Sequence, residues 1–312
     1  MRIIEWNCQG GFRKKVQHLL DLNPDLLVIP ECESGKKLSF GKKVPHPRSF
    51  YWFGDNQNKG LGVFSYSEWT IEYLDYHNPR FRYVLPLKLK KAKEEHLLLA
   101  IWAMDDKMNK YRRYIGQVWE AINYYNNVLN DSVILIGDFN SNKIWDTKTR
   151  IANHTNLVNK LETNGIKSLY HVDSNEEQGN ESRATFYLYR DPEKSYHIDY
   201  CFLGNNFDLN KSSLSIGDSD TWLDRSDHCP LVADLHKVGV STLKCDNLID
   251  FATMELDACS VVTQSALQIF IEKLQKSLAS YQATKSEELR LELVNQIYEL
   301  QQADLTINGM NE

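Results

Sequence analysis

Polar residues stand at the ends of five apolar segments, and their types are those that carry out acid–base chemistry. They are Asn7 after RIIEW, Glu31 after DLLVIP, Asp138 and Asn140 after VILIG, Asp199 within YHIDYCF, and Asp227 with His228 in SDHCPL. Side chains alternate along a strand, so Asp138 and Asn140 are expected on one face. Polar groups gathered where strands end often form binding or catalytic sites, and a histidine can exchange a proton near pH 7.

Each of these residues also has a purely structural explanation when it is taken alone. Asn7 could form a turn, Asp138 could form an Asx-turn in GDFN, and Asp227 could cap a helix. Five such segments in one chain, with this residue chemistry, favour a functional site.

Strands and helices alternate over residues 1–239, and these elements must position the polar residues. Apolar and β-branched runs predict strands over Arg2–Asn7, Asp25–Glu31, Tyr51–Phe53, Gly62–Tyr66, Thr70–Tyr76, Tyr83–Leu89, Leu97–Ala103, Val133–Phe139, Ala184–Tyr189, His197–Leu203 and Leu231–Leu235. Helical spacing is found in Val16, Leu19 and Leu20, in Ile115, Val118, Trp119 and Ile122, and in Leu157, Val158 and Leu161 before Asn164-Gly165. Helices mixed with many strands favour a layered α/β domain.

Strand signals stop after about residue 240, which predicts two domains, 1–239 and 240–312. Apolar residues at helical spacing indicate one amphipathic helix; they are Leu256, Ala266, Ile269, Phe270, Leu274 and Leu278. Thr284-x-x-Glu287 resembles a capping box that opens a second helix reaching Leu300. This helical hairpin could pack on its own domain, or pair with a second copy or another protein.

Charge and composition limit the possible classes of protein. The chain of 312 residues is 42% hydrophobic and 25% charged, which excludes a wholly disordered or collagen-like chain. Its net charge of −6 resides in the residues after 239, so the first 239 residues are neutral. A dedicated polyanion binder usually has a basic excess. Contact with nucleic acid would therefore depend on local patches or on a bound metal.

The compartment is expected to be cytoplasmic, with no membrane contact. The longest apolar run, Leu97–Met104, is far shorter than the ~20 residues that cross a bilayer. The N-terminus lacks the apolar core of a secretory signal. Six well-separated cysteines without a CxxC pair argue against a zinc ribbon and a disulfide framework, and favour buried thiols.

The order of six motifs gives the sequence a family resemblance. WNCQGG, IPECE, GLGVFS, GDFNSN, YHIDY and SDHCPL resemble the endonuclease/exonuclease/phosphatase superfamily, which includes deoxyribonuclease I-like enzymes. The resemblance implies an α+β fold, a four-layer α/β/β/α sandwich, here with a C-terminal helical extension outside the resemblance. It also implies a divalent-metal phosphoesterase.

The resemblance further implies a metal site for Mg²⁺ or Mn²⁺. Glu31 corresponds to the principal metal-binding carboxylate, and Asn7 and Asp227 to its neighbours, which bind the metal directly or through water. An oxygen-only set of ligands suits these hard cations and suits zinc poorly.

Catalytic roles follow from the same correspondence, with Asp227 counted among the catalytic residues as well. His228 would either take a proton from the attacking water or hydrogen-bond the scissile phosphate, and Asp199 would orient it. Asp138 would align or deprotonate the water, and Asn140 would donate to a phosphate oxygen. A metal and fixed donors stabilise the negative charge that develops around phosphorus.

One family position has no clear counterpart here. Members often carry a His or Tyr after the strand that corresponds to LLLAIWAMDD, where it contacts the phosphate. Tyr111, Arg113 or Tyr114 could replace it, or each could belong to the following helix.

The substrate remains open between nucleic acid, which is favoured, and a small phosphate ester such as a nucleotide or inositide. Phe139 in GDFN, where the lipid and inositide branches commonly have Leu, favours a nuclease. Unpaired bases could stack on exposed aromatic residues, and lysine pairs at 14–15, 36–37 and 42–43 could contact a phosphate backbone; the candidate tryptophans are Trp52, Trp69, Trp102, Trp145 and Trp222. A third possibility is an interaction protein with a vestigial metal site.

Overall fold

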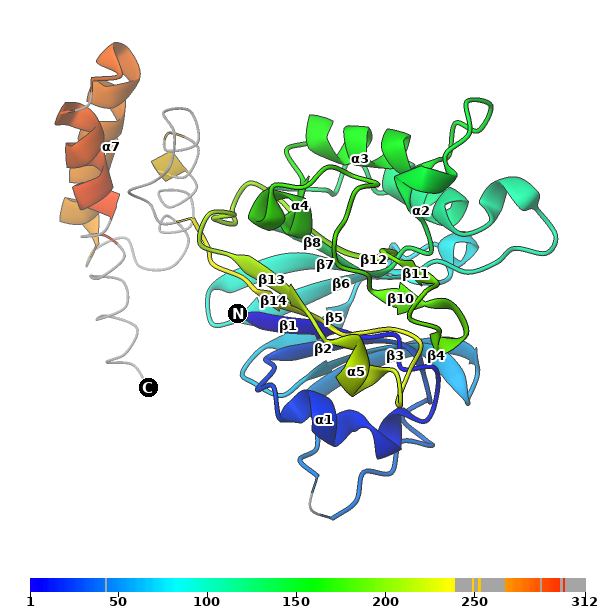
Figure 1. Cartoon of the computed structure of the whole chain (residues 1–312). Helices are drawn as coiled ribbons and strands as arrows, with labels where there is room; N and C mark the ends of the chain where they lie inside the picture. The colour runs from blue at the N-terminus through cyan, green and yellow to red at the C-terminus, as the bar shows by residue number, and fades with distance from the viewer. Residues whose placement is uncertain are drawn as a thin grey trace. The chain divides into compact units, whose positions relative to one another are not determined.

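Two six-stranded mixed sheets dominate the computed structural model (Figure 1). The first sheet has the order β13 (Ser213–Ile216), β14 (Leu231–Asp234), β1 (Arg2–Glu5), β2 (Leu26–Cys32), β4 (Lys59–Ser65) and β3 (Ser49–Asn56). The second has the order β5 (Thr70–Tyr73), β6 (Val84–Lys91), β7 (Glu94–Trp102), β8 (Val133–Asp138), β12 (Asp199–Leu203) and β9 (Lys167–Ser168). β10 (Phe186–Tyr187) and β11 (Ser195–Tyr196) form a separate hairpin.

Helices cover the outer faces of both sheets (Figure 1). α1 (Val16–Leu20) and α5 (Ser219–Trp222) lie against the first sheet, and α2 (Ile115–Tyr124) and α3 (His154–Thr163) cover the second. α4 (Leu169–Ser174) lies beside β12 and β13. Short 3₁₀ turns connect these elements; they are Phe12–Lys14, Pro79–Phe81, Lys110–Arg112, Lys143–Trp145 and Leu188–Arg190.

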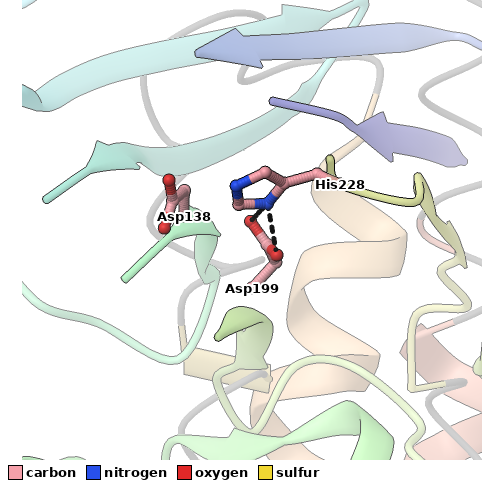
Figure 2. A group of neighbouring side chains, drawn as sticks. All are labelled: Asp138, Asp199 and His228. Carbon is pink, nitrogen blue, oxygen red and sulfur yellow. Dashed lines mark hydrogen bonds and ion pairs between the residues drawn. The ribbon is translucent and has the colours of Figure 1, made fainter. Parts of the chain in front are cut away.

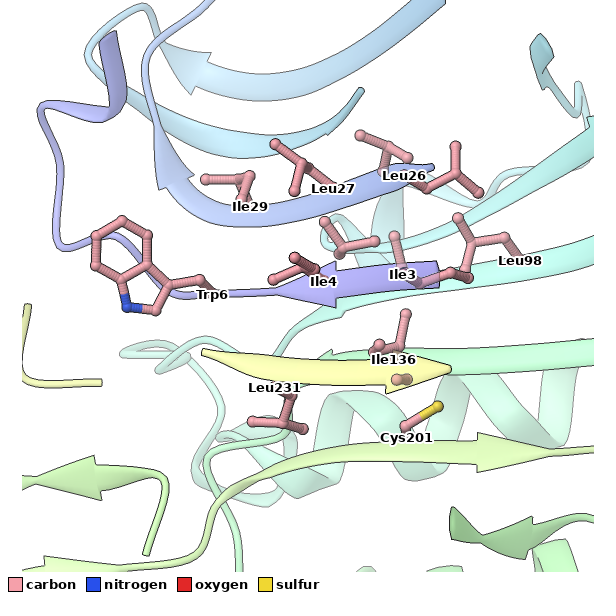
Figure 3. Packing of buried hydrophobic residues seen from close by; sticks show 14 of the residues in the cluster. Ile3, Ile4, Trp6, Leu26, Leu27, Ile29, Leu98, Ile136, Cys201 and Leu231 are labelled. Atoms are coloured by element: carbon pink, nitrogen blue, oxygen red, sulfur yellow. The ribbon is translucent and has the colours of Figure 1, made fainter. Parts of the chain in front are cut away.

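Strand β7 shows why the sequence builds four layers. Its alternate residues Leu98 and Ala100 pack in the cluster that the two sheets share, part of which is drawn in Figure 3. Leu97, Leu99 and Ile101 belong to a second cluster, formed with α2 and α3. Alternation along a strand buried on both faces thus places one sheet between helices and the other sheet. The predicted α/β/β/α sandwich is confirmed.

Several predicted elements differ from those observed. The strand predicted over Ala184–Tyr189 is reduced to β10, because Tyr189 takes a left-handed conformation (φ 61°) within a 3₁₀ turn. β9, β11, β13, α4 and α5 were not predicted; each spans six residues or fewer, too few for a reliable periodic pattern.

The chain divides into two compact units, Met1–Lys237 and Val238–Glu312. The structure describes residues 1–42, 44–238, 249, 252–253, 267–286, 288–297 and 300. Cys8, Cys32, Cys201 and Cys229 are free and buried, as predicted for them. None of the described helices has the length and apolar character needed to span a membrane.

The second unit contains α7 (Gln268–Thr284) and a further helical stretch over 288–297. Apolar residues of both pack together; they include Leu274, Leu278, Tyr281, Leu293, Val294 and Ile297. The capping box predicted at Thr284 is wrong. Thr284 is the last residue of α7, Lys285 ends that helix in a left-handed conformation, and the Ser286 hydroxyl accepts the Leu289 backbone N–H at 3.3 Å instead. Leu256, Ala266 and Glu287 lie outside the described residues.

Candidate active site

Two parallel strands bring Asn7 and Glu31 to one edge of the first sheet. β1 pairs with β2, and the pairing continues beyond β1 through Trp6 N–H to Val28 O (3.0 Å) and Cys8 N–H to Pro30 O (3.3 Å). The chain therefore leaves both strands at the same edge, with Asn7 buried and Glu31 partly exposed.

Two antiparallel strands of the second sheet place two carboxylates opposite each other. Asp138 ends β8, Asp199 begins β12, and the two residues are direct partners in the register. Both side chains are buried. Gly137, just before Asp138, has φ 151°, and a Cβ there would meet Ile101 O at 1.9 Å. The glycine of GDFN thus allows β8 to lie close against β7.

His228 completes a compact group with these carboxylates. Its Nδ1 lies 2.9 and 3.1 Å from the two oxygens of Asp199, and its ring lies between Asp199 and Asp138 (Figure 2). One ligand atom from each of the three residues lies within 4.8 Å of the others. The Trp6 indole N–H donates to His228 O at 2.8 Å, which fixes the backbone of SDHCPL beside β1.

Asp138 is held by two asparagines. It accepts hydrogen bonds from Asn7 Nδ2 (3.0 Å), from the Asn140 backbone N–H (2.8 Å) and from Asn140 Nδ2 (3.0 Å). The second amide hydrogen of Asn140 goes to Ala103 O at 2.9 Å. Asn140, which has φ 46°, therefore orients Asp138 here. To donate to a phosphate oxygen, which is the role expected for it, Asn140 would have to give up one of these two amide hydrogen bonds.

The two sides of the imidazole differ in electrostatics. Burial alone would lower the pKa of His228, but the charge and hydrogen bond of Asp199 outweigh it and raise this pKa to about 9. Burial and the nearby Asp199 charge raise the pKa of Asp138, with His228 acting in the opposite direction. At neutral pH the site therefore holds an imidazolium beside a carboxylate that binds a proton more readily than an exposed aspartate does.

Glu5 is a further acidic group that the sequence interpretation passed over. It is buried in β1, and both of its carboxylate oxygens lack a hydrogen-bond partner among the residues that the structure describes. Burial, followed by the charges of Asp199 and Asp138, raises the pKa of Glu5 well above its ordinary value. A glutamate inside the apolar run RIIEW was the signal available in the sequence.

Asp227 joins the site through Gln9, another residue that the sequence interpretation did not single out. Gln9 Nε2 donates to Asp227 Oδ2 at 2.9 Å, and the Gln9 backbone N–H donates to Asn7 Oδ1 at 3.1 Å. Gln9 has φ 50°. The Arg190 guanidinium in turn donates to Gln9 Oε1, so a cation lies at the Asp227 side of the site.

Among the described residues, Glu31 forms an ion pair with a lysine rather than a contact with His228 or the two aspartates. Its Oε1 lies 3.0 Å from Lys59 Nζ. An irregularity in the β2–β4 pairing and φ 61° at Glu31 turn this side chain away from the strand's ordinary alternation. Glu31 is thus at the predicted sheet edge, with Lys59 as its counter-charge.

The donor chemistry of the site fits a hard divalent cation. Asp138, Asp199 and Glu5 place three carboxyl groups in a buried space, where the raised pKa values of Asp138 and Glu5 reflect burial and the proximity of like charge. A divalent cation relieves such repulsion and favours the ionised carboxylates. Oxygen ligands from Asn7, Glu31 and Asp227 are of the type that Mg²⁺ and Mn²⁺ take.

The three candidates for the missing family position lie in different surroundings. Tyr111 is 68% exposed and Arg113 forms an ion pair with Asp105 at 3.1 Å. Tyr114 precedes α2 with φ 49° and lines a pocket together with Asn140. Tyr114 thus shares a pocket with a predicted site residue.

The sequence matches no protein-family model, and no curated protein matches it either. Solved structures do match. The endonuclease domain of TRAS1, a telomere-specific non-LTR retrotransposon, has a TM-score of 0.51 at 14% identity, over 76% of this chain and 98% of that one. An AP endonuclease from Archaeoglobus fulgidus has a TM-score of 0.53 at 16% identity, over 75% and 99%.

A third structure, D. rerio TDP2 complexed with single strand DNA product, has a TM-score of 0.53 at 15% identity, over 76% of this chain and 99% of that one. The chain therefore has the deoxyribonuclease I-like fold that these endonuclease/exonuclease/phosphatase structures share. This confirms, at the level of fold, the resemblance drawn from the six motifs.

Proposed function

We propose that this protein is a divalent-metal-dependent phosphodiesterase, specifically a nuclease that hydrolyses DNA or RNA by attack of water on phosphorus. The observation that carries the proposal is the buried Asp199–His228 pair facing Asp138. The fold supports it, since similar structures include an endonuclease domain, an AP endonuclease and a protein bound to a single-stranded DNA product.

In the proposed reaction His228 acts as a cation that binds the phosphate. Its Nδ1–H donates to Asp199, which leaves Nε2–H to donate to a non-bridging phosphate oxygen. Asp138, oriented by Asn7 and Asn140, accepts the proton of the attacking water. The water oxygen forms the new bond to phosphorus while the bond to the leaving oxygen breaks, and the leaving alkoxide takes a proton from solvent water. A carboxylate with a raised pKa is the better base for this step.

Asn7, Glu31 and Asp227 would hold Mg²⁺ or Mn²⁺, with Lys59 moving off Glu31 as the metal binds. The bound cation would supply charge stabilisation for the phosphate oxygens. Gln9 and Arg190 hold Asp227 in place for this role.

A cleavage panel tests the proposal. Wild-type protein, His228→Ala and the exposed-surface control His236→Ala are incubated with single- and double-stranded DNA, RNA and bis-nitrophenyl phosphate, with Mg²⁺, Mn²⁺ or EDTA. We expect polymer cleavage that needs the metal and His228 and is unchanged in His236→Ala. Turnover of the small ester alone would replace the nuclease by a small-ester phosphodiesterase. Activity that survives in His228→Ala would overturn the site assignment.

We also propose that the C-terminal unit mediates self-association. Ile269 and Leu291, on its helical residues, are 68% and 56% exposed, and apolar side chains exposed in this way suit a protein interface. Light scattering on the full chain should give twice the 36.3 kDa chain mass, and the double variant Ile269→Lys, Leu291→Lys should give the chain mass. A wild-type protein with the mass of one chain would contradict this.

A further inference from the structure

A pocket of about 340 Å³ opens beside Asn140. Tyr114, Trp145, Asp146 and Arg150 line it together with Asn140. Its volume falls in the range of pockets that hold small ligands or single groups of a larger one. Asn140 contributes to this pocket and also hydrogen-bonds Asp138, so a ligand group in the pocket would adjoin the proposed reaction centre.

The charge balance of this pocket favours an anion. Asp146, its acidic residue, is occupied at the start of α3, because its oxygens accept the backbone N–H groups of His154 (2.9 Å) and Thr155 (2.8 Å). Arg150 donates to Arg113 O at 2.7 Å. Its Nε is buried without a hydrogen-bond partner, and it forms no ion pair among the residues that the structure describes. A partly buried arginine without a counter-charge is a suitable group for a phosphate.

Two neighbouring arginines differ from Arg150 in having a counter-charge. Arg112 pairs with Glu120 at 3.3 Å, and Arg113 pairs with Asp105 at 3.1 Å. Arg112 and Arg113 are thus paired with carboxylates, whereas Arg150, which lines the pocket, has no such pair among the described residues.

Trp145 adds an aromatic surface to the same pocket. Of the five tryptophans considered as stacking surfaces, Trp69, Trp102 and Trp222 are buried in the core, and Trp52 is partly buried. Trp145 is 49% exposed and its ring lies 5.2 Å from that of Tyr196. An indole supported by a second ring and open to solvent provides a platform for an unpaired base.

We propose that this pocket binds one nucleotide of an unpaired nucleic-acid strand, with its phosphate on Arg150 and its base against Trp145. The inference rests on the proposed nuclease function and narrows its substrate class to single-stranded or frayed ends. A free nucleotide offers the same phosphate and base, so the experiment includes both a nucleic-acid strand and a free nucleotide.

Binding is measured by fluorescence anisotropy on the full chain in EDTA, so that no hydrolysis takes place. The probes are a fluorescein-labelled thymidine hexamer, the same strand in a duplex, and thymidine monophosphate as competitor. Arg150→Gln should weaken hexamer binding about tenfold and reduce the slope of log affinity against log salt by about 0.7, one single-strand phosphate contact. Trp145→Ala should weaken it about tenfold without changing that slope, and should leave duplex binding unchanged.

Matched controls separate the pocket from general charge and folding effects. Arg48→Gln removes one exposed arginine and Phe50→Ala one exposed aromatic ring outside the pocket, and both should bind the hexamer as the wild type does. Arg150→Lys keeps the positive charge and Trp145→Phe keeps an aromatic face, so both should retain binding within about threefold, and thermal unfolding checks that every variant is folded.

The possible outcomes are distinct from those of the cleavage panel. Equal hexamer binding by Arg150→Gln and Arg48→Gln, or no wild-type binding of any probe, would overturn the nucleotide pocket even if metal-dependent cleavage is found. Arg150-dependent binding without any cleavage would support the pocket and contradict the nuclease. Displacement of the labelled hexamer by thymidine monophosphate at a lower concentration than unlabelled hexamer requires would support the pocket, with a free nucleotide as its ligand.

Discussion

Two polar clusters of the first unit contain carboxylates, yet the pKa values of those carboxylates shift in opposite directions. The acidic cluster consists of Asp138, Asp199, His228 and Glu5. The histidine–amide network consists of His154, Gln178, His171, Glu181 and Asn142. In the network, Glu181 accepts hydrogen bonds from His171 Nε2 (3.1 Å), the Gly179 N–H (2.9 Å) and Asn142 Nδ2 (3.0 Å).

Burial alone would raise the pKa of Glu181, but these donors lower it to about 2. In the acidic cluster, burial and the like charges of neighbouring carboxylates raise the pKa of Asp138 and Glu5, although Asp138 also accepts three hydrogen bonds. A partly buried carboxylate with three donors is thus stabilised in its ionised form, whereas fully buried carboxylates beside like charges are destabilised in that form. Sites of the second kind are where a ligand or metal gains the most by binding.

The largest effect is expected from removing the imidazole of the acidic cluster. His228→Ala should lower metal-dependent cleavage about 10³-fold, because a positioned acid–base or charged group contributes on the order of 10²–10⁴. Initial rates at saturating metal measure this, and a urea titration should show that the variant is folded under the assay conditions, although less stable because Asp199 loses its partner. A matching loss of rate in His154→Ala, with the fold intact, would remove the distinction between the two clusters.

Disruption of the histidine–amide network should act on stability instead. Glu181→Ala leaves His171 Nε2 and the Gly179 N–H without their shared acceptor, which should lower the free energy of unfolding by about 2–3 kcal/mol. Chemical denaturation measures the change. Cleavage per folded molecule should fall far less than in His228→Ala. Unchanged stability would show that Glu181 is dispensable for the fold.

The activity should decrease at high pH. His228 has a raised pKa of about 9, so its cationic form is lost above that pH and the rate should fall about tenfold per pH unit. In Asp199→Asn the charge that raises this pKa is absent, and the decrease should begin at lower pH. Rate profiles of both proteins test this, and coincident high-pH limbs would exclude His228 as the titrating group.

The smallest effect concerns Glu5 and the pH dependence of stability. Its pKa is raised in the folded state, so above the ordinary value of 4.5 the native state binds more protons than the unfolded state. Its contribution to stability is therefore complete below pH 4.5 and is lost as pH rises, by up to about 1.4 kcal/mol per pH unit. Glu5→Gln should remove this slope in denaturation series. The same slope in both proteins would contradict the prediction.

Long apolar strands and the residues that follow them were predictable from the sequence. Asp138 follows the apolar run VILIG, and His228 stands in SDHCPL just before the last strand of the first sheet. The position of both residues beside Asp199 agrees with the order of the six motifs. Glu5 was not predicted because its burial without a hydrogen-bond partner among the described residues depends on tertiary packing. Gln9 was not predicted because its hydrogen bond to Asp227 joins residues 218 positions apart in the sequence. The capping box at Thr284 failed because the sequence offers two serine or threonine caps, and the backbone at Lys285 decides between them.

The left-handed backbone around the site has a consequence for protein engineering. Gln9, Glu31, Asn140 and Tyr114 all have positive φ, between 46° and 61°, a conformation that costs non-glycine residues on the order of 1 kcal/mol or more each. Grafting only the reactive side chains onto another two-sheet scaffold would therefore orient them differently. A transplant would have to include the four turns, and the host would need enough spare stability to tolerate them.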